Sequence, residues 1–177
     1  MMKKATIYVF AVSLGLLFLA GPALAAVQYL GETTWTLTIN QDKNGPVEPP
    51  QSYDMKGCIT HQGGAYYTVQ TYLPGPDGSP IGSGGGVLVE GKLYLTLSHS
   101  QKHTGTVMET GVTHVELDQA TLSGTFYQVV RSFDTATAGA NPVFTDDFWS
   151  GTITCDSPIN LTPWASVSPT TLLLLNK

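Results

Sequence analysis

The sequence has few charged residues, and basic ones are the scarcest. Charged side chains make up 12% of the chain, and eight Lys and Arg stand against thirteen Asp and Glu. Without Lys3 and Lys4 at the N-terminus, six basic residues remain against the same thirteen acids, a net charge of six minus thirteen, or −7. Proteins that bind nucleic acids through phosphate contacts need clusters of basic residues. The composition therefore argues against nucleic acid as a partner.

Metal and catalytic motifs are also lacking. The chain contains neither a GxSxG nor an HExxH motif, so nucleophilic and zinc-dependent hydrolysis have no support. His99 and His103 have the four-residue spacing that suits joint metal ligation on a helix, but on a strand they would lie about 13 Å apart. We expect no metal site, no cofactor and no catalytic residue.

An acidic cluster comes nearest to catalytic chemistry. His114, Glu116 and Asp118 occupy alternate positions, and Glu109 lies close to them in sequence. Paired carboxylates perform acid and base catalysis on sugars, but acids at alternate positions are also typical of a strand that faces solvent. We adopt the solvent-facing interpretation and keep an enzyme, such as a cyclase or hydrolase with carboxylates at a barrel mouth, as the third hypothesis for function.

Cysteine is nearly absent, since the chain has only Cys58 and Cys155. In an oxidising compartment such a pair predicts a disulfide, which would join the second predicted strand to the last. Closing a loop of about a hundred residues stabilises the fold by about 4 to 5 kcal/mol in the chain-entropy model. The chain has no CxxC motif that would favour a redox or metal role.

The N-terminus predicts export to such a compartment. Lys3 and Lys4 precede an apolar run over residues 5–20, a Gly-Pro break and the small-residue site Ala-Leu-Ala that ends at Ala25. This order is typical of a secretory signal peptide. We assign residues 1–25 to a signal peptide, and we expect a periplasmic or secreted mature protein with no membrane span after cleavage.

The most prominent feature of the sequence is an alternation of apolar and polar residues. Leu93, Leu95 and Leu97 alternate with mostly polar positions, which is the pattern of a strand with one face in a core. No segment after the signal has a helical period. The expected fold class is all-β: an antiparallel up-and-down barrel of about eight strands over residues 26–155, with a β-sandwich as the alternative. The predicted strands cover residues 35–39, 53–62, 65–73, 87–90, 93–99, 107–118, 122–133 and 144–155.

Three further segments have a composition that predicts their local structure. Residues 74–86 hold three prolines and six glycines, which predicts a loop, or a lid at one end of the sheet. Gly111 predicts a β-bulge in its strand. Residues 156–177 hold three prolines and end in four leucines at 172–175 before Asn-Lys. We expect this tail to pack on the barrel, as an edge strand or subunit contact, or to be disordered.

The early Gly31 and Trp35, on the first strand of an exported meander of about eight strands, resemble the lipocalin-type or calycin barrels. In that family a glycine and a tryptophan open the first strand, and a late basic residue packs over the tryptophan. Three residues separate Gly31 from Trp35 here, where the family has one. By the resemblance Arg131, the only arginine, takes the role of the basic residue. The resemblance implies a cavity for a small apolar ligand.

The aromatic residues suggest where such a ligand would bind. We expect its contacts among Trp35, Tyr66, Tyr94, Leu95 and Phe126, with the loop at 74–86 at the mouth of the cavity. The leading hypothesis is an exported, non-catalytic binding protein for a small apolar or amphipathic molecule. The alternative is a structural or protein-interaction module with a filled core, either as a monomer or as a homo-oligomer.

The signal-peptide assignment makes the first testable prediction. N-terminal sequencing of the protein recovered from its own cells is expected to begin at Ala26, because the small-residue site ends at Ala25. A chain that retains residues 1–25 would show that this segment is an uncleaved anchor.

Overall fold

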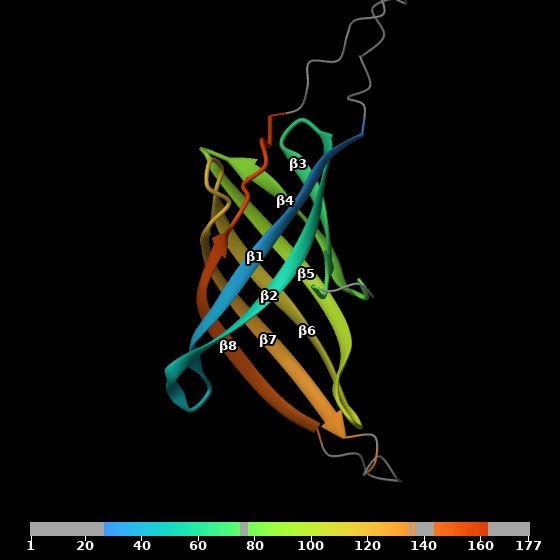
Figure 1. Cartoon of the computed structure of the whole chain (residues 1–177), viewed down its shortest axis with the longest axis vertical. Helices are drawn as coiled ribbons and strands as arrows, with labels where there is room; N and C mark the ends of the chain where they lie inside the picture. The colour runs from blue at the N-terminus through green and yellow to red at the C-terminus, as the bar shows by residue number, and fades with distance from the viewer. Residues whose placement is uncertain (1–26, 75–77, 135, 137–143, 163–177) are drawn as a thin grey trace, which may run out of the picture.

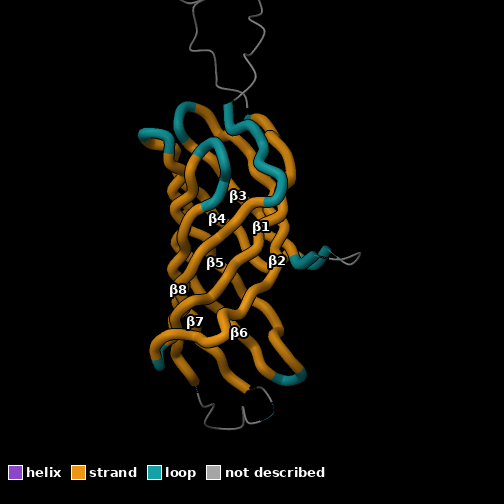
Figure 2. Tube along the Cα trace, turned by 60° about the vertical axis from the view of Figure 1, so that its left-hand side comes forward, coloured by secondary structure: helices purple, strands orange, loops and turns teal. Residues whose placement is uncertain are grey.

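Eight antiparallel strands form a closed barrel in this protein (Figures 1 and 2). The computed structural model describes residues 27–74, 78–134, 136 and 144–162. Each strand pairs with the next along the chain, and β1 pairs with β8 to close the sheet. The strands are β1 (Gln28–Asp42), β2 (Gly45–Gly63), β3 (Tyr66–Tyr72), β4 (Pro80–Val89), β5 (Lys92–Thr104), β6 (Val107–Asp118), β7 (Gly124–Asp134) and β8 (Phe144–Cys155).

The expected fold class is confirmed, because the sheet is all-β, antiparallel and closed rather than split into a sandwich. The signal peptide and the leucines at 172–175 lie outside the described residues. None of the residues that the structure describes forms a helix long and apolar enough to cross a membrane.

One end of the barrel is filled by large apolar side chains and is here called the closed end. Trp35, Leu93, Leu117 and Leu122 are each at most 1% exposed there. The indole Nε1 of Trp35 donates a hydrogen bond to the carbonyl of Leu122 at 3.1 Å. Gly57 leaves the space for the indole, since a Cβ at that position would lie 2.0 Å from the ring.

Residues 156–162 cover this closed end. The backbone N–H of Asp156 donates to the carbonyl of Thr34, and Tyr67 donates its hydroxyl hydrogen to the carbonyl of Leu161 at 3.0 Å. The side chain of Leu161 is 1% exposed and belongs to the core. Burying a leucine side chain stabilises a fold by about 1.5 to 3 kcal/mol. The first part of the tail is therefore an integral part of the barrel interior.

The role that the resemblance gave to Arg131 is wrong. Its guanidinium is on the outer surface, where it donates to both carboxylate oxygens of Asp146 at 2.6 and 2.7 Å. Trp35 is covered instead by Leu122, whose carbonyl accepts the indole hydrogen bond.

The prediction of a loop over residues 74–86 is wrong from Pro80 onward. Residues 80–89 form β4, and the glycines within it pair with β3 and β5. Glycine is rare inside strands, but it occurs where backbones approach closely. A Cβ at Gly84 would lie 1.9 Å from the carbonyl oxygen of Thr96, and one at Gly86 would lie 1.8 Å from that of Tyr94. The glycine run therefore allows a tight curve of the wall.

The predicted disulfide is also wrong, because both cysteines are free. Cys58 on β2 lies opposite Glu32 on β1, and its thiol lies on the outer surface. Cys155 lies on the other side of β1, and its sulfur is 2.8 Å from the inward-facing hydroxyl of Thr33. Two strand spacings, about 9.6 Å, separate the cysteines across the sheet. A disulfide needs Cα atoms within about 7 Å and converging side chains.

This placement predicts two reactive thiols in the unfolded, unreduced protein. Iodoacetamide added in denaturant without reductant is expected to give a mass increase of two carbamidomethyl groups. A parallel sample that is reduced before the iodoacetamide is added should show the same mass increase. A sample that gains the two groups only after reduction would show a disulfide and contradict the structure.

Candidate ligand-binding cavity

A cavity of about 460 Å³ opens at the end of the barrel opposite Leu161. This open end holds the β1–β2 turn and the β5–β6 turn (Figure 1). The volume lies in the range of about 300 to 1,000 Å³ that is usual for small-molecule sites. An eight-stranded barrel is wide enough to hold one small ligand.

The barrel is hollow here because the inward positions of several strands carry small or polar side chains. On β4, Gly82 lies between Thr71 of β3 and His99 of β5, so that this part of the wall contributes no side chain to the interior. On β6 the inward residue is Thr113, whereas Leu117 on the same face fills the closed end. Smaller inward side chains leave the space that the cavity occupies.

Most of the cavity wall is apolar. Met55 of β2 and Leu97 of β5 point into it, and Trp149 of β8 covers one side. Such a wall favours a ligand with an apolar body, because burial removes its surface from water. The other apolar lining residues are Leu37, Ile39, Val47, Leu73, Ile81 and Val115.

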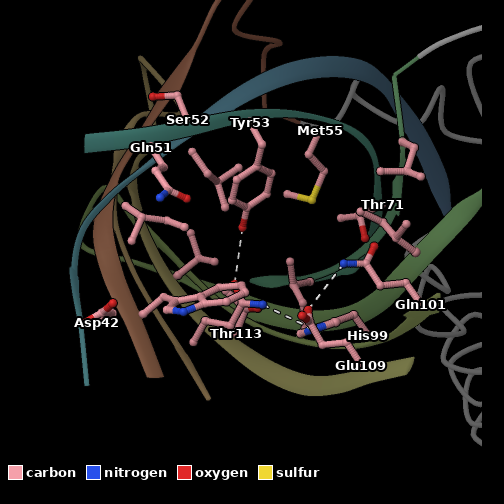
Figure 3. A pocket seen from close by; sticks show the side chains of 18 of the residues that line it. Asp42, Gln51, Ser52, Tyr53, Met55, Thr71, His99, Gln101, Glu109 and Thr113 are labelled. Carbon is pink, nitrogen blue, oxygen red and sulfur yellow. Dashed lines mark hydrogen bonds and ion pairs between the residues drawn. The ribbon is translucent and has the colours of Figure 1, made fainter. Parts of the chain in front are cut away.

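A polar cluster forms one part of the wall, as Figure 3 shows. Tyr53 crosses the cavity from β2 and its hydroxyl donates to Oε1 of Gln128 at 3.3 Å. Nε2 of His99 lies 3.3 Å from Oε1 of Glu109 and 3.3 Å from Nε2 of Gln128. Nε2 of Gln101 donates to Glu109 at 3.4 Å. These side chains come from β2, β5, β6 and β7, so the cluster depends on barrel closure.

Gly111 makes room for this cluster. It pairs in register with His99 and Val130, and the register shift between β5 and β6 lies between Lys102 and Thr104, so the bulge predicted at Gly111 is absent. A Cβ at Gly111 would lie 2.6 Å from Cε1 of the His99 ring. The glycine therefore positions the imidazole against the inner wall.

The hydrogen bonds around His99 fix two consistent proton patterns, because one ring nitrogen either donates or accepts. If Nε2 carries the proton and donates to Glu109, the amide of Gln128 is rotated so that its oxygen faces His99 and its NH₂ faces Tyr53. Amide orientation is assigned from such networks. In that pattern Tyr53 accepts, and its own hydroxyl hydrogen is available to a ligand. In the other pattern Gln128 donates to an unprotonated Nε2, and Tyr53 donates to the oxygen of Gln128.

Two buried threonines add hydrogen-bonding capacity. Thr71 is 2% exposed and Thr113 is 7% exposed, and both line the cavity. Neither hydroxyl makes a hydrogen bond to any other part of the chain that the structure describes. Buried polar groups are normally satisfied, by protein, by water or by a ligand. These hydroxyls therefore favour a ligand that carries polar atoms as well as an apolar body.

The residues expected to contact a ligand are not brought together. Trp35, Leu95 and Phe126 are buried in the core at 1, 3 and 3% exposure, whereas Tyr66 and Tyr94 are 66 and 41% exposed on the outside. None of the five lines the cavity. The tyrosine that points inward next to Tyr66 is Tyr67, which packs edge-on against His61.

The sequence missed the polar cluster, although the alternation contained a signal for half of it. His99 continues the odd-numbered series of Leu93, Leu95 and Leu97, and Glu109 shares the parity of Val115, so both face inward. The same alternation applies to the other half, since Tyr53 shares the parity of Met55, and Gln128 that of Phe126.

The outer acids are placed as the solvent-facing interpretation predicts. His114 and Asp118 are exposed, and Glu116 forms an ion pair with Lys92 on the outer surface. Glu109 alone faces the interior. Among the described residues no group of three or more His, Cys, Asp and Glu side chains could hold a metal ion.

Comparisons with known proteins give no relative. No protein-family model matches the chain, and neither the curated proteins nor the solved structures contain a match to it. The function must therefore be argued from the cavity itself.

The buried cluster predicts a loss of stability at high pH. Burial, and then the charge of Glu109, raise the pKa of Tyr53 above the ordinary value of 10, and burial also raises the pKa of Tyr67. The unfolded chain then binds fewer protons than the native one above pH 10, so the free energy of unfolding falls as pH rises from there. Tyr53→Phe is expected to make the decline shallower, by up to about 1.4 kcal/mol per pH unit.

Urea unfolding at a series of pH values from 9 upward measures this slope. Tyr66→Phe is the matched control, because Tyr66 is on the outer surface. Equal slopes for Tyr53→Phe and Tyr66→Phe would contradict the placement of Tyr53.

Proposed function

We propose that this protein is an exported, non-catalytic carrier of a small, mostly apolar molecule that has a hydrogen-bonding head group. The observation that carries the proposal is the composition of the cavity wall: an apolar pocket of about 460 Å³ with polar side chains gathered on one part of it. The apolar wall holds the body of the ligand, and the cluster of His99, Glu109, Gln128 and Tyr53 fixes its polar end.

The preferred head group is a neutral one, such as a hydroxyl or a carbonyl. Glu109 is 5% exposed and already lies against His99, and a second full charge beside this pair would require further desolvation. The hydroxyls of Thr71 and Thr113, and that of Tyr53 in one proton pattern, both donate and accept. They suit a hydroxyl or carbonyl group.

The binding role agrees with the lipocalin-like resemblance of the first strand and with the eight-stranded barrel, which is an argument by analogy of fold. Export supports the same role, because an apolar molecule dissolves poorly in water. It therefore needs a carrier where it has to cross an aqueous compartment. The signal-like residues 1–25 are the basis for that part of the proposal.

The first experiment locates the ligand. The fluorescence of N-phenyl-1-naphthylamine, a neutral apolar probe, is expected to rise on binding with a micromolar Kd. Ile81→Trp is expected to weaken the binding of the probe at least tenfold, because Ile81 lines the cavity and the larger side chain narrows it. Val89→Trp, at an exposed position on the same strand, is the matched control. No binding, or equal loss in both variants, would contradict the proposal.

The second experiment tests the polar wall. Displacement of the probe by 1-naphthol is expected to need at least tenfold less competitor than displacement by naphthalene, equivalent to about 1.4 kcal/mol. The double variant Thr71→Val, Thr113→Val should reduce this preference, and the outward pair Thr68→Val, Thr96→Val should leave it unchanged. Equal competition by the two compounds in the unmodified protein would show that the wall does not select a polar group.

A further inference from the structure

The outer surface of β6, β7 and β8 carries a concentration of apolar side chains, here called the β6–β8 face. The three strands lie side by side in the barrel (Figure 1). Val112, Tyr127, Val129 and Phe144 are 39 to 54% exposed. Outward-facing strand positions elsewhere are mostly threonine, serine or charged residues, as on β1 and β2. The face is completed by Met108, Phe133 and Phe148.

Strand register arranges these residues in rows. One row runs from Val112 through Val129 to Phe148. Another runs from Met108 through Phe133 to Phe144, and the rings of Phe133 and Phe144 lie 5.7 Å apart. The two rows make two apolar bands, which are separated by one row of polar residues.

The intervening row holds one cation and one anion. Arg131 pairs with Asp146 across β7 and β8, through two hydrogen bonds, and both side chains are more than half exposed. The guanidinium also lies 5.7 Å from the centre of the Phe144 ring. The face is thus close to neutral, although the whole chain has a formal net charge of −5.

We propose that the β6–β8 face is a self-association surface, and that its occupant is the same face of a second copy of this chain. An isologous dimer brings each residue of a patch toward its counterparts across a two-fold axis. A two-fold axis that runs along the strands between β7 and β8, near Val129, places Arg131 of one copy opposite Asp146 of the other. The four charges then alternate in sign, so the face complements itself.

Two features of the molecule favour a second copy at this place. The net negative charge makes two copies repel wherever acids dominate, and in the β6–β8 face the charge of Asp146 is matched by that of Arg131. In addition, the closed barrel leaves no strand edge in its sheet for edge-to-edge pairing, so association of the barrels must use side chains.

The size of the face sets the strength of the dimer. Three strands wide and about seven residues long, it covers roughly 300 Å² from strand geometry, less than the about 800 Å² per partner of a standard stable interface. The dimer is therefore a weak one, which forms only at high protein concentration.

The test is a charge swap measured by sedimentation velocity over a concentration series of the purified protein. Arg131→Asp makes the row wholly acidic and Asp146→Arg makes it wholly basic, so each variant alone is expected to dimerise at least tenfold more weakly. An equimolar mixture of the two variants should recover the dimer, because the faces are again complementary. Lys56→Asp, which breaks the outer Lys56–Glu32 pair on β2, matches the charge change of Arg131→Asp and should leave dimerisation unaltered.

Several outcomes would overturn the proposal. They are a protein that stays monomeric at millimolar concentration, a dimer that both single variants retain, or a mixture that fails to recover it. A monomer that instead floats with phosphatidylcholine vesicles would show that the occupant is a membrane surface. Circular dichroism of each variant confirms that the barrel is intact.

Discussion

The structure depends on the pairing of β1 with β8, which turns a meander of strands into a closed barrel. Closure gives the backbone of every strand a partner on both sides and removes the exposed edges that an open sheet would present. It also fixes which side chains face inward, because a shift of one strand by one residue would turn all of its side chains to the opposite face. The polar cluster follows from this constraint, since Tyr53 on β2 meets Gln128 on β7 only across a closed interior.

The interior is divided between a filled half and a hollow half. Trp35 and the leucines around it, with Leu161 from the segment after β8, close one end. At the other end Thr113 takes the place that a larger apolar side chain would fill, and glycines in β4 contribute no side chain. The cavity therefore lies beside the filled half and shares Leu37, Met55 and Leu97 with the core.

The alternation of apolar and polar residues predicted the number and class of strands, because period two is a local property of the chain. It failed where tertiary packing outweighed local preference: residues 82–86 form a strand despite their glycines, and the backbone of β5 leaves no room for a Cβ at Gly82, Gly84 or Gly86. The prediction of a disulfide failed because the sequence does not show that Cys58 and Cys155 face opposite sides of the sheet. Predicting the cavity residues required knowledge of which strands lie opposite one another. The parity of His99 alone already placed its side chain inside.

Methyl NMR spectra of the protein, recorded while 1-naphthol is added, test the division into a filled and a hollow half most directly. The methyl signals of Met55, Leu97 and Val115, which line the cavity, are expected to shift with a common saturation curve, and those of Leu117 and Leu161 at the closed end are expected to stay in place. Shifts confined to the outer surface, or no shifts at all, would contradict the claim that this barrel holds its ligand inside.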